Sequence, residues 1–339
     1  MADTHFPLLR LPETAMHHVL KSMDYIELTS YSLLSRKTKL LIKSLKIQAS
    51  KIFVGIWKFC LVLQIRFQNL ENVEISMFEI KNPNRDTLKL NVETPCNKVS
   101  VSTRLFRGPQ KWNIQPLNLK GWLDHVSSIF NYCEPPILDF DSEVEVFDTK
   151  SIRKAIAEVS GLTIHTRPEY GREILRLFLS DAKCKDICFQ CDPFTNEPSV
   201  VFQKVGIQNL NAVYFCWFSE IALDDLLMFN FHYIDISNRF LMTVKEINRF
   251  IRSWIKGSNH KLKWIQMFFK TLNVATVLRG IPYQVMSEST ERTFGAESSK
   301  IRSIIKGGFD VRNKKGITAN IQIKNYDGAR SSIAMYVMN

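Results

Sequence analysis

The chain has 339 residues, of which 45% are hydrophobic and 23% charged, and its net charge at pH 7 is +12. This balance is that of a folded protein and excludes an intrinsically disordered one, and the length allows two or three domains. We expect neither a signal peptide nor a membrane span, because the most apolar stretch, 52–67, is too short and is interrupted by Lys58 and Arg66.

The basic residues are concentrated in three runs. Residues 36–51 contain six basic and no acidic residues, 239–270 contain eight against Glu246, and 300–330 contain eight against two aspartates. Neither an RNA-binding signature of aromatic and glycine residues nor a zinc-finger spacing accompanies these runs. We favour solvated faces, while a site for an acidic or phosphorylated protein segment and nucleic-acid binding stay open.

The first 45 residues predict three short helices. Pro12 suits the first turn of a helix, since its missing N–H would be unpaired there. Asp24 and Glu27 form a capping-box pattern for a second helix, and Ser35 can cap a third. The apolar residues of the first helix recur at spacings of three and four, on one face: Met16, Val19, Leu20 and Met23.

Three such helices cannot enclose a core within about forty residues, so either the rest of the chain or another protein covers their apolar surface. Their residue order resembles the F-box, the module that docks on the Skp-type adaptor of cullin–RING ubiquitin ligases. Thr38 departs from the family, which usually has an aromatic residue at this position. The matching positions are Leu9, Leu11, Pro12, Val19, Leu20, Met23, Asp24, Leu28, Ser32, Arg36 and Ile42.

The resemblance implies a non-catalytic ligase subunit whose F-box, residues 1–48, binds the adaptor and, through it, the ligase. We expect helix residues at the docking surface to supply most of the affinity. The predicted adaptor-binding residues are Leu9, Pro12, Met16, Val19, Leu20, Met23 and Leu28.

The next region, 49–119, predicts a small antiparallel sheet that joins the F-box to the rest of the chain. Residues 54–67, 73–80, 88–92 and 98–106 are rich in β-branched and aromatic residues or alternate in polarity. Clusters of Asn, Pro and Asp separate these segments and predict turns between them.

From residue 120 to 339, short apolar strands alternate with segments of helical periodicity. The strand starts lie 25, 25, 26, 20 and 31 residues apart, which is typical of leucine-rich-repeat architecture. We predict an α+β chain whose last part is a leucine-rich-repeat-like α/β solenoid with an exposed, ligand-binding sheet; a compact α/β domain without repeats stays open. The six predicted strands are 137–140, 162–165, 187–190, 213–216, 233–236 and 264–267.

Residues 223–267 resemble the F-box-associated domain of type 2. Thr243 with Glu246 can cap the helix of this segment, Gly257 can end it with a positive φ, and Asn259 lies in the turn to the next strand. The positions that carry the resemblance are Thr243, Glu246, Ile247, Asn248, Phe250, Trp254, Ile255, Gly257, Ser258 and Asn259. We expect them to be structural.

The C-terminal part predicts a β-hairpin. Segments 309–312 and 318–323 flank a turn near Gly316, and 331–338 predicts a further strand. The polar segment 288–300 predicts a loop.

Catalytic and metal motifs are absent from the sequence. Cys184, Cys188 and Cys191 lack the paired ligand spacing and fourth partner that zinc requires, and no phosphate-binding glycine loop precedes a Lys-Ser or Lys-Thr pair. We therefore expect no catalytic residue, no cofactor and no metal. Seven cysteines without framework spacing fit reduced thiols, which predicts a cytoplasmic or nuclear protein.

The sequence thus predicts a substrate-recognition subunit of a Skp–cullin–F-box ubiquitin ligase, with an unidentified target protein bound by the C-terminal region and no membrane partner. The alternative is a basic nucleic-acid-binding or scaffold protein that uses the Lys/Arg-rich C-terminal face. A third class is an enzyme of unrecognised type.

Overall fold

The computed structural model divides the chain into two compact units, Met1–Ser160 and Gly161–Asn339. No helix within the described ranges is long and apolar enough to cross a membrane. The structure describes residues 8–58, 60–69, 71–78, 89–96, 98–103, 107–112, 116–179, 183–195, 199–217, 221–239, 242–295, 302–326 and 330–338.

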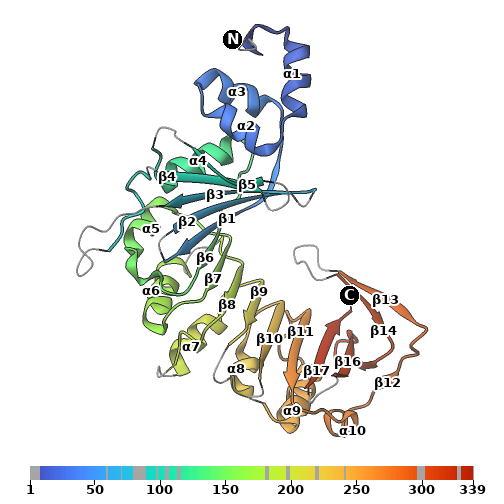
Figure 1. The fold of residues 1–339 in the computed structure, drawn as a ribbon. Helices are drawn as coiled ribbons and strands as arrows, with labels where there is room; N and C mark the ends of the chain where they lie inside the picture. Colours follow the sequence, from blue (N-terminus) through green and yellow to red (C-terminus); the bar gives the residue numbers. More distant parts are fainter. Residues whose placement is uncertain are drawn as a thin grey trace. The chain divides into compact units, whose positions relative to one another are not determined.

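The first unit begins with the predicted three helices (Figure 1). The capping box of the second helix is confirmed: Asp24 Oδ1 accepts from the Glu27 N–H at 2.8 Å, and Glu27 Oε2 accepts from the Asp24 N–H at 3.0 Å. Ser35 caps the third helix together with Thr38, whose Oγ1 accepts from the Ser35 N–H at 3.0 Å. Buried Thr38 therefore serves as a capping residue, which an aromatic side chain could not do. These elements are η1 (Leu8–Arg10), α1 (Glu13–Ser22), α2 (Tyr25–Ser32) and α3 (Arg36–Ser44).

An antiparallel meander of five strands follows, which confirms the predicted antiparallel sheet. The predicted segment 54–67 is divided between β1 and β2, and β5 was not predicted. A sixth strand, β6, pairs in parallel with β1, with Val54 beside Leu138. The predicted strand at 88–92 is wrong: Leu90 makes one isolated bridge to Phe147, because its backbone bonds to the chain before α5, and Leu88 lies outside the described residues. The strands are β1 (Ala49–Trp57), β2 (Cys60–Phe67), β3 (Asn72–Phe78), β4 (Lys98–Thr103), β5 (Arg107–Trp112) and β6 (Ile137–Phe140).

Residues 120–160 belong to this first unit. Helix α4 (Leu119–Ile129) packs against α2, α3 and β2, and η2 (Val144–Val146) and α5 (Thr149–Ala155) follow β6. The first compact unit therefore extends past residue 119, where the α/β region was predicted to begin, because α4 and β6 return to elements formed much earlier in the chain.

The second unit is built on five parallel strands in chain order, each joined to the next by a helix on one side of the sheet (Figure 1). All five were predicted, with starts correct to within one residue. The strands are β7 (Gly161–Ile164), β8 (Asp186–Phe189), β9 (Ala212–Phe215), β10 (Tyr233–Arg239) and β11 (Trp264–Phe269). The connecting helices are α6 (Pro168–Phe178), α7 (Ser199–Gly206), α8 (Leu223–Met228) and α9 (Val244–Ile255).

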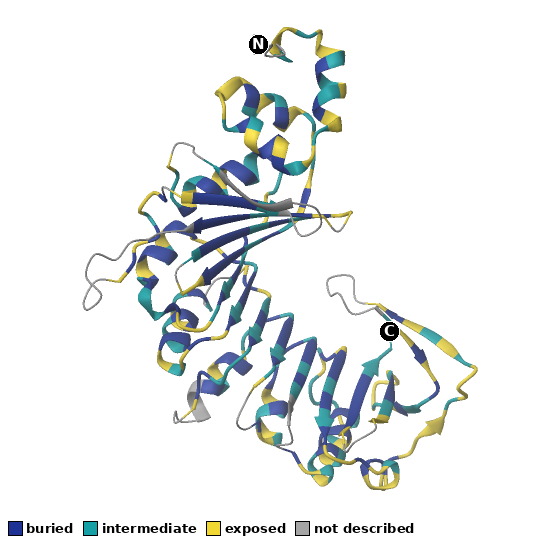
Figure 2. Ribbon diagram, in the orientation of Figure 1, coloured by how far each residue is buried: buried dark blue, intermediate teal, exposed yellow. Residues whose placement is uncertain are grey.

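Phenylalanine rings fill the space between these strands and their helices. Phe189 stacks on Phe215 at 5.6 Å between ring centroids, and Phe202 of α7 meets Phe215 edge-on at 5.9 Å. Phe229 stacks on Phe215 from the other side at 5.7 Å. The strand residues that carry these rings, Phe189 and Phe215, are buried, and Figure 2 shows buried segments of the strands in dark blue. Aromatic burial thus holds the helices on the sheet.

The sheet continues through antiparallel strands and stays open at its end. The predicted hairpin with its turn at Gly316 (φ +81°) and the predicted last strand are confirmed. These elements, which follow α10 (Val274–Val277), are β12 (Gln284–Val285), β15 (Phe309–Arg312), β16 (Thr318–Tyr326) and β17 (Arg330–Val337).

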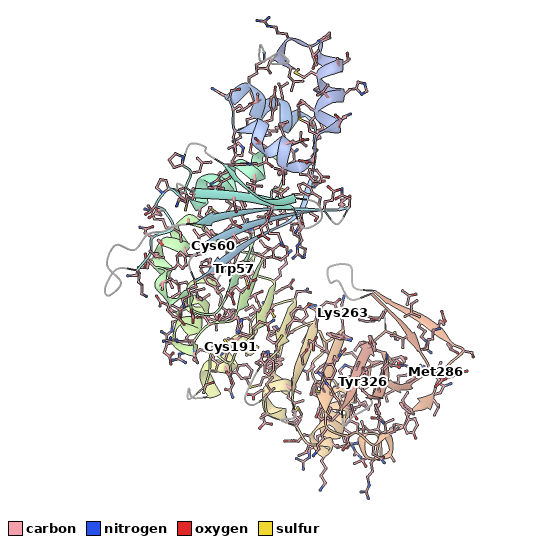
Figure 3. The ribbon with its side chains drawn as sticks, in the orientation of Figure 1. Trp57, Cys60, Cys191, Lys263, Met286 and Tyr326 are labelled. Atoms are coloured by element: carbon pink, nitrogen blue, oxygen red, sulfur yellow. The ribbon has the colours of Figure 1, made fainter. Side chains whose placement is uncertain are left out.

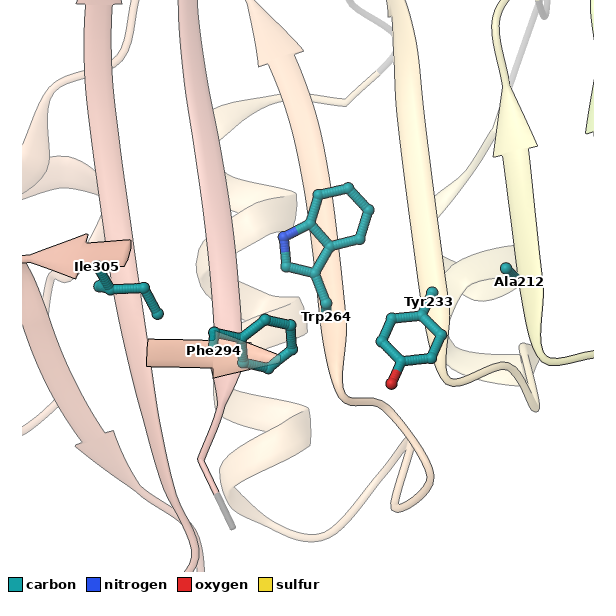
Figure 4. Packing of buried hydrophobic residues seen from close by; sticks show 5 residues of the cluster. All are labelled: Ala212, Tyr233, Trp264, Phe294 and Ile305. Carbon is teal, nitrogen blue, oxygen red and sulfur yellow. The ribbon is translucent and has the colours of Figure 1, made fainter. Parts of the chain in front are cut away.

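The predicted loop at 288–300 is wrong for 291–295, which form β13 (Glu291–Gly295) and pair with β14 (Arg302–Lys306) in a second hairpin. Residues 296–300 lie outside the described residues. Phe294 and Ile305 of this hairpin pack on Trp264, Tyr233 and Ala212, on the face of the sheet opposite the helices (Figure 4). Burial of these two apolar side chains orders a segment whose overall composition is polar.

The caps predicted in the F-box-associated segment are confirmed. Thr243 Oγ1 accepts from the Glu246 N–H at 3.3 Å, and Gly257 has a φ of +107°. Asn259 has a φ of +48°, and its Nδ2 donates to the carbonyls of Leu226 (2.7 Å) and Phe229 (3.1 Å). Asn259 therefore ties the end of α8 to the chain after α9.

We predict that Asn259→Ala destabilises this segment by about 2–4 kcal/mol, since two buried carbonyls lose their donor and an alanine is strained at positive φ. Asn259→Gly loses the same bonds without the strain and should cost about 1 kcal/mol less. Hydrogen exchange of the amides in 223–260 measures both values. If both variants and the parent showed equal protection from hydrogen exchange, the stabilising role of the Asn259 side chain would be contradicted.

Candidate functional site

Helix α2 attaches the F-box helices to the sheet of the first unit. The Tyr25 ring stacks on Phe67 with centroids 3.8 Å apart, and the edge of Phe130 completes the cluster, 5.0 Å from Phe67. Helix α2 also packs against α3, α4, β3 and β4. One side of the F-box is thus already buried within its own unit.

A buried hydrogen bond reinforces this attachment. Ser32 Oγ donates to the Thr29 carbonyl at 2.7 Å and lies 2.7 Å from His125 Nε2 of α4. Because the Ser32 hydroxyl proton is used in the bond to the Thr29 carbonyl, we assign the ring proton of His125 to Nε2. This N–H then donates to Ser32 Oγ. Burial, and secondarily the charge of Lys39, lowers the pKa of His125 to about 4, so the imidazole is neutral at pH 7.

The structure separates the seven predicted docking residues into two groups. Leu20 is fully buried, and Met16 and Leu28 are nearly so, so these three stabilise the F-box core and cannot form its outer surface. The prediction needs correction for those three. Leu9 (44% exposed) and Pro12 are exposed, while Val19 and Met23 are half-buried.

Two exposed leucines were missed as candidates. Leu34, directly after α2, is 71% exposed, and Leu40 on α3 is 58% exposed. Both lie in the first module, whose helices show exposed segments in yellow in Figure 2. Helical spacing identifies apolar positions, but it could not show which of them the chain leaves uncovered.

The second unit has a cavity of about 1190 Å³. Its wall combines the residues before β10 and β11, the strand β13, and the turn between β15 and β16. Lys263 and Met286, both labelled in Figure 3, contribute to this wall. The lining is mainly polar and basic.

All seven cysteines are free thiols. Cys188 Sγ in β8 lies 3.9 Å from Cys216 Sγ, directly after β9, whereas Cys191 Sγ donates to the Thr166 carbonyl at 2.8 Å. Within the part of the chain that the structure describes, no three His, Cys, Asp or Glu side chains are placed to hold a metal ion together.

Comparison with known families agrees with the helical module. Residues 8–49 match the F-box domain, and residues 201–267 match the F-box associated family. The chain carries an F-box domain and an F-box-associated segment. The F-box-associated match begins 22 residues before the predicted segment and so includes α7 and β9. No curated protein and no solved structure matches the chain.

We predict that the first unit, which contains the F-box domain, loses stability as the pH falls. His125 has an ordinary pKa of 6.5 when unfolded and about 4 when folded, so the unfolded state binds its proton first. The free energy of unfolding therefore falls as the pH decreases from 6.5 towards 4. Between pH 7 and pH 5 the decrease is up to about 2 kcal/mol.

The measurement is hydrogen exchange of the α2 and α4 amides at pH 7 and pH 5, corrected for the intrinsic exchange rate. His125→Gln cannot titrate in this range and serves as the control. A loss of the same size in both proteins would show that other groups cause it.

Proposed function

We propose that the chain is the substrate-recognition subunit of a Skp–cullin–F-box ubiquitin ligase. The observation that carries the proposal is the F-box match at 8–49 together with apolar residues of this module that the unit leaves uncovered. Such a subunit raises the concentration of a target near the charged ubiquitin transferase and performs no covalent chemistry itself.

The docking surface that we propose comprises Leu9, Pro12, Val19 and Met23, extended by the exposed Leu34 and Leu40. Large apolar side chains that stay exposed on a folded module mark interaction sites, particularly when polar residues surround them. Met16, Leu20 and Leu28 support this surface from the core.

We propose further that the second unit holds the target in the manner of a leucine-rich-repeat-like solenoid. The succession of parallel strands and helices in chain order supports this architecture. The F-box-associated match lies in this unit as well. We place the protein in the cytoplasm or nucleus, where free thiols remain reduced.

We predict that Pro12→Ala combined with Val19→Asp weakens adaptor binding at least about thirtyfold, because a charge on the docking helix must be desolvated against an apolar groove. Isothermal titration of the full chain with a purified Skp-type adaptor measures the affinity.

The matched control is Ile207→Asp with Pro282→Ala, which makes the same two changes at exposed positions of the second unit. The control should bind the adaptor as the parent does. Undiminished binding by the Pro12/Val19 variant, with its helicity retained, would refute the docking surface.

A further inference from the structure

The cavity of the second unit runs along the edge of strand β13. Arg292, Thr293, Phe294 and Gly295 are consecutive in the chain and all contribute to its wall. Side chains of a strand alternate between two faces, so four consecutive residues can share one cavity only where it follows the strand edge.

That edge of β13 has unused backbone groups. Among the described residues β13 pairs with β14 alone, and no other backbone bond is made by residues 292–295. An open strand edge with free N–H and C=O groups is a template for adding a further extended segment. Among the described residues, no atom lies within 4 Å of where a Cβ on Gly295 would be, so the space beside its Cα is open there.

The charge of the wall is positive and uncompensated. Lys263, Arg312 and Lys315 come from three different segments, are exposed, and make no ion pair within the described part of the chain. The one carboxylate among the described lining residues, Asp310, is engaged by Arg292 Nη1 at 2.8 Å and by Asn320 Nδ2 at 2.8 Å.

His232 reports the same positive potential. It lines the cavity, and burial together with the charges of Lys263 and Lys261 lowers its pKa. A negatively charged occupant would relieve this repulsion.

We propose that the cavity binds an extended acidic segment of the target protein, which adds to the free edge of β13 and places carboxylates beside Lys263, Arg312 and Lys315. This inference rests on the proposed function for its identification of the bound segment as a target. Beyond the proposed function, the inference specifies where the target segment binds, its extended conformation and its negative charge.

The lining argues for carboxylates rather than phosphate or nucleic acid. Phosphorylated segments are held by converging arginines, but of the two arginines here Arg292 is already paired with Asp310. Single-stranded nucleic acid stacks on exposed aromatic rings, whereas the aromatic side chains in this wall, Tyr233 and Phe294, are both buried.

The test uses the full chain and fluorescence anisotropy with a labelled synthetic peptide of alternating Thr and Glu, on the order of twelve residues so that it spans the strand edge. We expect it to bind at least about tenfold more tightly than the same peptide with Gln for Glu. Methylating alternate backbone nitrogens of the acidic peptide should also weaken binding at least about tenfold, because pairing with β13 requires those N–H groups.

Two variants of the protein locate the site. Lys263→Glu, Arg312→Glu and Lys315→Glu together should abolish the preference for Glu over Gln. The control, Lys245→Glu, Lys256→Glu and Lys270→Glu, makes the same change of net charge at exposed lysines outside the cavity and should bind as the parent does. Gly295→Leu leaves the charge unchanged but fills the open space and should weaken binding about tenfold or more.

Equal affinity for the Glu and Gln peptides would overturn the proposal. An equal loss of affinity for the acidic peptide in the two triple variants would overturn it as well. Full binding by Gly295→Leu, or by the methylated peptide, would overturn the placement along β13. An oligothymidylate that competes as well as the acidic peptide would instead identify a nucleic-acid site. Adaptor affinity is measured separately, so a failed docking surface leaves these outcomes intact, and a failed cavity leaves adaptor binding intact.

Discussion

The stacking of Tyr25 on Phe67 decides which surface of the F-box remains for another protein. An apolar surface that is already buried within the chain cannot also bind another protein. Because Tyr25 stacks on Phe67, the Tyr25 side of α2 packs on the sheet of the first unit. The Ser32–His125 bond fixes the same helix to α4 at a second point. What remains uncovered is therefore the apolar surface that includes Leu9 on the approach to α1 and Leu40 on α3.

The elements that sequence predicted well are those whose causes are local. Asp24 reaches Glu27, and Thr243 reaches Glu246, within three residues, so each capping box is visible in the sequence itself. The parallel strands are short apolar runs because helices cover one of their faces and the β13–β14 hairpin covers part of the other.

Strand β6 was predicted at 137–140, but its partner in the sheet was not, because that pairing depends on a contact between distant segments. Strand β6 joins the first unit because Leu138 lies beside Val54, and nothing in either segment specifies that partner. Helical periodicity correctly grouped Met16 and Leu20 with Val19, but it cannot show which of them the neighbouring helices cover. The sequence could predict the apolar face of α1 that contains the proposed docking residues. Only the packing shows which residues of that face are buried and which are exposed.

The hairpin β13–β14 changes the function expected of the sheet. An uncovered sheet face would offer a broad platform, but Phe294 and Ile305 occupy part of that face and bury Trp264. The polar residues of the same segment then stand at the border of this cover, where Arg292 and Thr293 line a cavity with a free strand edge. A segment that looks like a polar loop in sequence thus covers part of one sheet face. It also supplies the free strand edge and the charge of the proposed interface. In the proposed complex, strand pairing accepts many side chains, so the basic residues around the edge would carry the discrimination between targets.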